Sequence, residues 1–330
     1  MRRREFIKLL GGGLTAAWTP AVARAEILHK RPLIAFLSPG AEKFTMAHTA
    51  PSFLQGMRDL GYVDRRDFDI VYRFSEGYQD RLPVLADELV RLNPNVILAS
   101  AVVAAVAARK ATSSIPIVCP ALADAVHLGL VASEARPGGN VTGIEPYVAG
   151  LPAKQMELAR EIVPGASVVG LLTNIKDPKA PPQVQELEAS ARALEVKVVS
   201  ADANQPEDLA NALQALASAH VDVVIVLQTS MLISENARIA QSALAKRLVT
   251  VYGYREHVVA GGLISYGVDL RWCFHRGAYF VDKILHGTPA GDLPVEFPTK
   301  VMLSVNLKTA KILGFTVPPS LLARADEVIE

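Results

Sequence analysis

Short runs of hydrophobic residues alternate with longer segments of helical periodicity from residue 31 onward. The short runs are nearly continuous in Val, Ile and Leu, which is typical of strands that helices cover on both faces of a parallel sheet. The longer segments end at turn residues such as Gly61, as helices commonly do. Strands and helices in alternation predict βαβ units with right-handed crossovers.

These elements fall into two series of similar size. The first series predicts strands at residues 32–38, 69–73, 95–100 and 115–118 and helices at 53–60, 80–92 and 101–111. The second predicts strands at 168–172, 196–200, 221–227 and 249–252 and helices at 154–162, 183–194, 207–219 and 234–248. We therefore expect an α/β protein with two doubly wound parallel-sheet lobes.

Each series ends in a similar segment, a Gly-Gly turn followed by a short strand and another glycine, at 138–145 and at 261–269. Glycine tolerates the torsion changes of a hinge, so these segments are candidate crossovers between the lobes, although ordinary turns explain them equally well. The crossover interpretation assigns residues 31–143 plus about 262–288 to lobe 1. It assigns residues 146–258 plus about 292–330 to lobe 2.

The first 25 residues have the three parts of an export signal: a basic start at 2–4, a short apolar stretch at 6–18 and Ala23-Arg24-Ala25. We expect a signal peptide at 1–25, cleaved after about Ala25, and a mature protein in the periplasm. Residues 3–8 resemble a twin-arginine signal, and the Sec route stays open. The alternative is the basic N-terminus of a cytosolic protein.

Composition narrows the choice of function. Charged residues make up 20% of the chain and the formal net charge is +1, so no strong field recruits nucleic acid or an acidic membrane. Seven His and two Cys occur without metal-ligand spacing, and we expect no metal and no cofactor. Cys119 and Cys273 either pair or remain buried thiols. Because phosphate-loop, dinucleotide and nucleophile-elbow motifs are absent, the sequence favours a binding protein over an enzyme.

Long segments carry a family resemblance. They include "MRRREFIKLLGGG", "RPLIAFLSPG", "GMRDLGYVDRRDFDIVYRFSEGYQDRLPVLADELVRLNPNVILAS", "HLGLVASEARPGGNVTGI", "GGLISYGVDL" and "DLPVEFPTKVMLSVNLKTAKILGFTVPPSLLARADEVIE". Together they resemble the ABC-transporter substrate-binding family, which includes tryptophan-, tyrosine- and phenylalanine-type binders. The resemblance implies a type I periplasmic-binding fold, with hinge crossovers and a ligand trapped between two lobes. It also implies a permease and an ATPase as partners. The sequence departs from the usual family pattern in the loops at 100–102, 173–178 and 228–231.

Ligands of doubly wound sheets bind outside the carboxyl ends of the strands, and that rule selects the candidate ligand-binding residues. They are Ser38, Pro39, Ser100, Ala101, Asp124, Asn174, Gln228, Thr229, Ser230, Tyr254, Tyr266 and Asp269.

Several of these residues also have an ordinary structural interpretation. Ser100, before the helix at 101–111, places a ligand carboxylate at a helix N-terminus or is a simple cap. Asp124 binds an ammonium group or caps a following helix. Tyr254 and Tyr266 stack on the ligand or pack below it, and Asp269 caps the helix through residue 286 or contacts the ligand.

The function that follows is capture of a small amino-acid-like ligand, with aromatic amino acids among the candidates, for an ABC importer. The cleft closes on the ligand, and no bond is made or broken. We expect a monomer. A sensory module that presents its ligand to a membrane receptor and a two-lobed α/β enzyme are the alternatives.

Overall fold

The computed structural model describes residues 31–146 and 148–330, so the predicted signal peptide at 1–25 lies outside the described residues. Residues Arg31–Glu330 form one compact unit with two sheets. In this part of the chain, no helix is long and apolar enough to cross a lipid bilayer.

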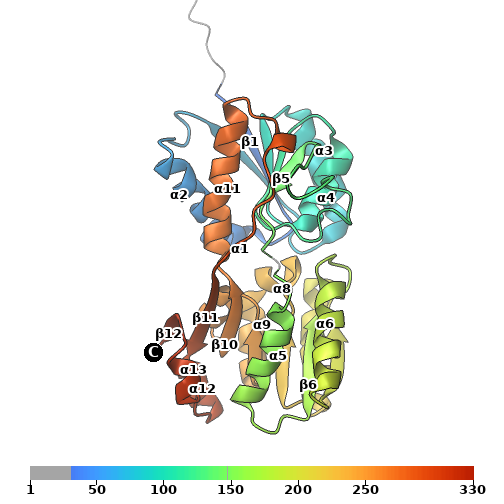
Figure 1. The fold of residues 1–330 in the computed structure, drawn as a ribbon, viewed down its shortest axis with the longest axis vertical. Helices are drawn as coiled ribbons and strands as arrows, with labels where there is room; N and C mark the ends of the chain where they lie inside the picture. Colours follow the sequence, from blue (N-terminus) through green and yellow to red (C-terminus); the bar gives the residue numbers. More distant parts are fainter. Residues whose placement is uncertain (1–30, 147) are drawn as a thin grey trace, which may run out of the picture. The chain divides into compact units, whose positions relative to one another are not determined.

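The first lobe contains a five-stranded parallel sheet in the order β2-β1-β3-β4-β5 (Figure 1). Alternate residues of β1 (Leu33–Ser38) face opposite sides of the sheet. Ile34 and Phe36 belong to the core beneath α2 and α11, whereas Ala35 and Leu37 belong to the core beneath α3 and α4. The elements are β1 (Leu33–Ser38), β2 (Asp69–Phe74), β3 (Val96–Ala99), β4 (Ile117–Cys119), β5 (Val141–Gly143), α1 (Glu42–Phe44), η1 (Thr45–Thr49), α2 (Ala50–Asp59), α3 (Leu82–Arg91), α4 (Val102–Ala111) and α11 (Leu270–Leu285).

The second lobe contains a seven-stranded sheet in the order β12-β11-β10-β9-β8-β6-β7. One apolar core of Val, Leu, Ile and Ala side chains holds its helices against the sheet. The strands are β6 (Val168–Thr173), β7 (Lys197–Asp202), β8 (Val223–Val226), β9 (Thr250–Tyr252), β10 (Ile264–Val268), β11 (Val301–Asn306) and β12 (Glu327–Ile329). The helices are α5 (Leu151–Ile162), α6 (Ala180–Ala193), α7 (Leu209–Ser218), α8 (Ser230–Ser234), α9 (Asn236–Ala245), α10 (Arg255–Val259), α12 (Leu307–Leu313) and α13 (Pro319–Leu322).

The predicted two-lobed α/β fold and all eight predicted strands of the two series are confirmed, with two differences. The second sheet is not wholly parallel, because β10 and β11 are antiparallel. The chain leaves this lobe at the end of β10 and re-enters directly into β11, so β11 runs back along its neighbour. The helix predicted at 234–248 is two helices, α8 and α9, that meet at Glu235.

Three crossovers join the lobes: β5 to α5, β10 to α11, and the segment before β11 (Figure 1). The domain boundaries predicted at about 262 and 292 need correction. Residues 264–268 belong to the second sheet, because β10 pairs with β9. Leu293 and Val295 pack in the first-lobe cores, so the chain returns to the second lobe only after them.

Gly267 has a packing role at the end of β10. A Cβ atom on Gly267 would lie 1.8 Å from the backbone oxygen of Gly253, so only glycine allows these two segments to approach so closely. This close approach explains the glycine at position 267 without the torsional freedom that a hinge requires.

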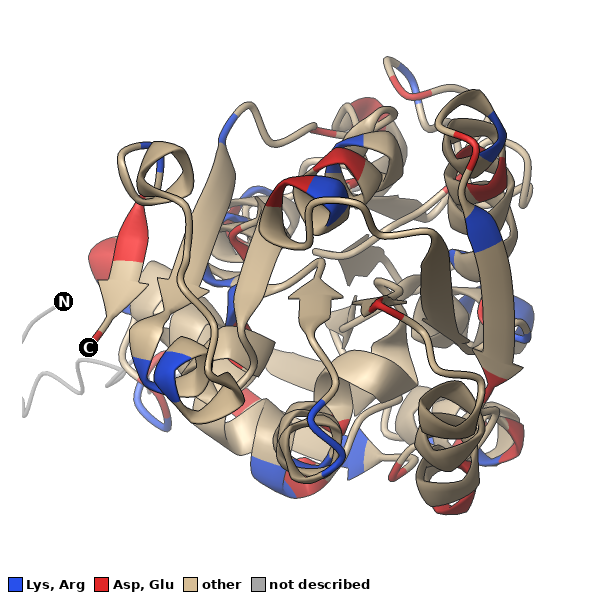
Figure 2. Ribbon diagram, turned by 90° about the horizontal axis from the view of Figure 1, so that it is seen from below, with Lys and Arg blue, Asp and Glu red and all other residues tan. Residues whose placement is uncertain are grey.

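Basic and acidic positions are interspersed on the helices and loops in the view of Figure 2, and the strands in its centre carry few of either. This distribution agrees with the near-zero formal charge of the chain.

Candidate functional site

A pocket lies where the carboxyl ends of the two sheets meet, and both lobes contribute to its wall. Its cavity volume is about 40 Å³, and the space between its lining atoms reaches about 440 Å³ when the part that is open to solvent is included. The lining residues are Ser38, Pro39, Gly40, Phe44, Thr45, Thr49, Ser100, Ala101, Ala121, Lys179, Thr229, Ser230, Ile233, Tyr254, Leu270 and Phe274.

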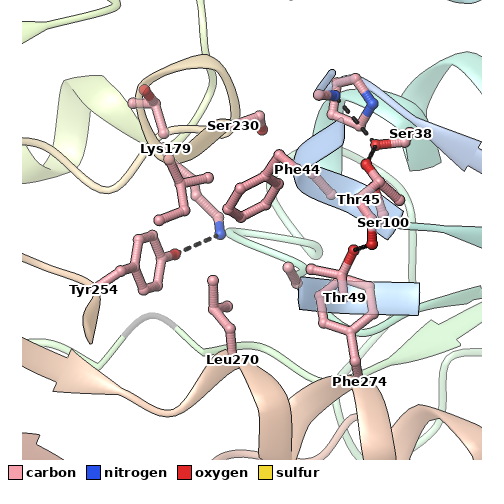
Figure 3. Close-up of a pocket in the computed structure, with 16 residues that line it drawn as sticks. Ser38, Phe44, Thr45, Thr49, Ser100, Lys179, Ser230, Tyr254, Leu270 and Phe274 are labelled. Carbon is pink, nitrogen blue, oxygen red and sulfur yellow. Dashed lines mark hydrogen bonds between the residues drawn. The ribbon is translucent and has the colours of Figure 1, made fainter. Parts of the chain in front are cut away.

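Hydroxyl groups and aromatic rings form the first-lobe side of the pocket (Figure 3). Ser38 is the last residue of β1, and its hydroxyl lies 2.9 Å from the Thr45 hydroxyl. The Thr49 hydroxyl donates to the Thr45 carbonyl at 3.4 Å. Phe44 and Phe274 provide apolar surface beside them. This side can therefore accommodate an apolar group with a few hydrogen bonds at its edge.

A buried lysine dominates the second-lobe side. Lys179 is 4% exposed, and its ammonium group extends toward the Tyr254 hydroxyl, which lies 3.5 Å from Nζ (Figure 3). Burial by itself lowers the pKa of Lys179, but Tyr254 and the Asp177 carboxylate favour the ammonium form and leave the pKa above its ordinary value. The lysine is a positive charge at the pocket wall.

Asp177 holds the loop that carries Lys179. One carboxylate oxygen accepts from the backbone N–H of Lys179 at 3.0 Å, and the other accepts from the backbone N–H of Ser230 at 2.9 Å. This carboxylate thereby fixes the loop after β6 to the start of α8, and both of its oxygens are engaged by backbone donors.

Thr229 presents a hydroxyl group without a partner. The residue is 1% exposed and lines the pocket, and its Oγ1 has no hydrogen-bond partner among the described residues. Because an unpaired buried hydroxyl costs free energy, a group that bound in the pocket and paired with it would gain that free energy back.

The structure brings seven of the twelve predicted residues to this pocket: Ser38, Pro39, Ser100, Ala101, Thr229, Ser230 and Tyr254. The other five lie outside its lining. Ser100 does not cap α4, since the N-cap position is Ala101 and it carries no side-chain cap bond. The predicted direct contacts of these residues with a ligand stay predictions.

Two of the outlying acids have other environments. Asp269 caps α11 by accepting from the Arg271 backbone at 2.9 Å, and it also forms an ion pair with the Arg271 side chain. Asp124 is exposed and precedes a series of turns, so the helix that it was predicted to cap does not form. The Glu145 carboxylate accepts from the Asp124 backbone N–H at 2.7 Å and holds it in that turn.

The other three outlying residues belong to the interior of the second lobe. Gln228 donates to the Gly253 carbonyl at 2.8 Å and connects the ends of β8 and β9. Tyr266 is partly buried and packs against the second-lobe core. Asn174 is fully buried, and neither atom of its side-chain amide has a partner among the described residues.

Lys179, Phe44 and Thr45 are the main residues that the sequence did not predict. Phe44 and Thr45 lie in the segment between the first strand and first helix, which shows no clear periodicity. Lys179 directly precedes α6, which begins at Ala180 with Pro181 and Pro182 in its first turn, three residues before the predicted helix start. The Asp-Pro pair at 177–178 was a signal for a turn before α6, because such pairs favour turn initiation, but it does not indicate which side chain points inward.

Cys119 and Cys273 are both buried free thiols. Burial raises the pKa of each thiol to about 12, so neither is a thiolate at neutral pH. Among the described residues, no group of three or more His, Cys, Asp or Glu could hold a metal ion.

Two α/β lobes joined by three crossovers, with a pocket between the carboxyl ends of their sheets, define a two-lobed ligand-binding protein of the type I periplasmic-binding fold. The chain belongs to the family described as ABC transporter substrate binding protein, whose profile matches residues 41–329. Proteins of this family carry small molecules to the permease and ATPase of ABC importers, and they work in the periplasm or outside the cell.

Three similar proteins illustrate this family. A tyrosine-binding protein of Clostridioides difficile (strain R20291) is 26% identical over 261 residues, which are 79% of this chain and 75% of that protein. A conserved domain protein from Vibrio cholerae has a TM-score of 0.82 at 28% identity and covers 91% of this chain and 100% of its own. A Streptococcus pneumonia ABC domain solved in complex with L-Trp has the same TM-score and coverages at 24% identity, which shows the shared fold.

Proposed function

We propose that this protein is the solute-binding component of an ABC importer and captures one small molecule in the pocket between its lobes. The observation that carries the proposal is that a single pocket takes its lining from the strand ends of both sheets. A ligand there touches both lobes at once, so it stabilises the arrangement in which the lobes are together. No bond is made or broken.

The pocket suits a ligand with a carboxylate at one end and an apolar body at the other. Lys179 supplies a buried positive charge for the carboxylate, and Phe44, Leu270 and Phe274 supply apolar surface for the body. Amino acids and small carboxylic acids without an ammonium group both have these two parts. The 26% identical relative, a tyrosine-binding protein, supports a ligand with a carboxylate and an aromatic body.

Contacts between the lobes support closing on the ligand. The Ala41 backbone N–H of the first lobe donates to the Ser234 hydroxyl of the second at 2.7 Å, and the Tyr78 hydroxyl donates to the Glu207 carboxylate at 2.5 Å. These bonds form only when the two rims are in contact. The three crossovers are the segments that change their torsion angles as the lobes separate.

In this proposal the protein acts in the periplasm as a monomer, after export through the signal at 1–25, and delivers its ligand to a permease and an ATPase. The order of basic, apolar and small residues in that segment supports export.

Two measurements test the proposal. Mass spectrometry of the solution released when the purified protein is denatured should identify a small molecule in a ratio of about one per chain. Deletion of the gene should abolish uptake of that molecule, and expression of the intact protein should restore it. A protein that releases no solute and shows no thermal shift with any compound of a metabolite library would refute solute capture.

A further inference from the structure

The lining of the pocket carries a positive charge that no negative charge in the lining balances. Its described lining contains one full charge, the Lys179 ammonium, and contains no Asp or Glu. Among the described residues, Nζ donates one hydrogen bond, to the Tyr254 hydroxyl at 3.5 Å. An ammonium group has three donors, so Lys179 retains donors for a ligand. The unpaired Thr229 hydroxyl, in the same wall, is a second polar group that a ligand could satisfy.

The acids beside the pocket loops do not contribute a carboxylate to the pocket lining. Asp177 is fully buried, and both of its oxygens accept from backbone N–H groups. Glu145 is 7% exposed and accepts from the backbone of Asp124. Asp269 is engaged by Arg271, and none of these acids lines the pocket.

An amino acid fits poorly into such a pocket. With its carboxylate on Lys179, the α-ammonium group would lie one carbon away, close to a second positive charge. It would also lose water without meeting a carboxylate, which is costly for a charged group. An acid with the same body but no ammonium avoids both penalties and still neutralises Lys179.

We infer that the pocket selects small carboxylic acids with an apolar or aromatic body and no ammonium group, rather than the corresponding amino acids. This inference rests on the proposed function and names the ligand class of the same site. The carboxylate pairs with Lys179 and accepts from the Thr229 hydroxyl. The body of the acid lies against Phe44, Phe274 and Leu270.

Matched pairs of ligands test the inference by calorimetry on the purified protein, after unfolding and refolding to remove any solute that it carries. The pairs are 3-phenylpropionate with L-phenylalanine, indole-3-propionate with L-tryptophan, and 4-methylpentanoate with L-leucine. We expect the ammonium-free member of at least one pair to bind at least tenfold more tightly than its amino acid. Equal or tighter binding of the amino acids would overturn the inference, and so would failure of all three ammonium-free acids.

Two variants locate the effect. Lys179→Met keeps the length of the side chain and removes its charge, and it should weaken binding of the preferred acid at least tenfold. Lys176→Met removes an exposed lysine from the same loop and should leave the affinity unchanged within twofold. Circular dichroism and the thermal midpoint establish that each variant is folded. Retained affinity in folded Lys179→Met would also overturn the inference.

These outcomes separate the inference from the proposed function. If the refolded protein binds an amino acid, or if the solute released on denaturation is an amine or a neutral molecule, the ligand class is wrong while solute capture stands. If no solute is released and the metabolite library gives no binding, solute capture itself fails.

Discussion

The hydrogen bond between Ala41 and Ser234 offers a test of cleft closure that leaves the pocket lining unchanged. Ser234→Ala removes only the hydroxyl that accepts from the Ala41 backbone N–H at 2.7 Å. The Cβ atom stays, and the serine is 9% exposed at the end of α8, so packing around it is retained. Neither residue lines the pocket.

The expected magnitude follows from the net contribution of one hydrogen bond, about 1 kcal/mol. The bond exists only with the lobes together, so its loss shifts the equilibrium toward separated lobes by that amount. The apparent affinity for the ligand should fall about fivefold. The ligand-free protein, once its lobes have separated, does not depend on this bond, and its free energy of unfolding should change by less than about 0.5 kcal/mol.

Calorimetry measures the affinity for the solute that denatured protein releases. Urea unfolding of the ligand-free protein measures the free energy of unfolding. Ser200→Ala, at an exposed serine on β7 of the same lobe, is the matched control and should change neither value. An unchanged affinity in Ser234→Ala would show that the bond does not contribute to the closed state. A loss of ligand-free stability as large as the loss of binding would refute the closure reasoning.

Three further predictions concern the pocket wall and the two lobes. Thr229→Val removes the unpaired hydroxyl, so the ligand-free protein should be as stable or more stable, and the affinity for the ligand should fall several-fold. Lower stability with unchanged affinity would contradict this prediction. Burial lowers the pKa of His257 from 6.5 to about 4, and this histidine is neutral in the folded protein. Below pH 6.5 the unfolded chain therefore binds a proton that the folded protein does not. The free energy of unfolding should decrease by about 3 kcal/mol as the pH falls from above 6.5 to about 4. Urea unfolding at each pH should show this slope, and His257→Gln should lose it. Gly56→Ala places a Cβ 2.3 Å from the His275 backbone oxygen on α11, so it should lower the free energy of unfolding by about 1–3 kcal/mol. Gly139→Ala is the control: no atom lies within 4 Å of its Cβ, and the free energy of unfolding should stay nearly unchanged.

The strands and the two-lobed architecture could be predicted from sequence because they depend on local pattern. Val224 and Ile225 in β8, for example, lie in a continuous apolar run that is stable only between two layers of helices. The C-terminal strands β11 and β12 were not predicted, since their pairing depends on where the third crossover returns the chain.

The sequence by itself determined which strand ends could face a ligand, and seven of its twelve candidates line the pocket. It could not determine which side chains at those ends turn inward. Lysine is usually a surface residue, and Lys179 follows an Asp-Pro pair in a loop. The Asp177 carboxylate nevertheless accepts from two backbone N–H groups and holds that loop against the pocket. Burial of a charge depends on contacts between segments about 50 residues apart, so the tertiary structure alone decided that the pocket is positively charged.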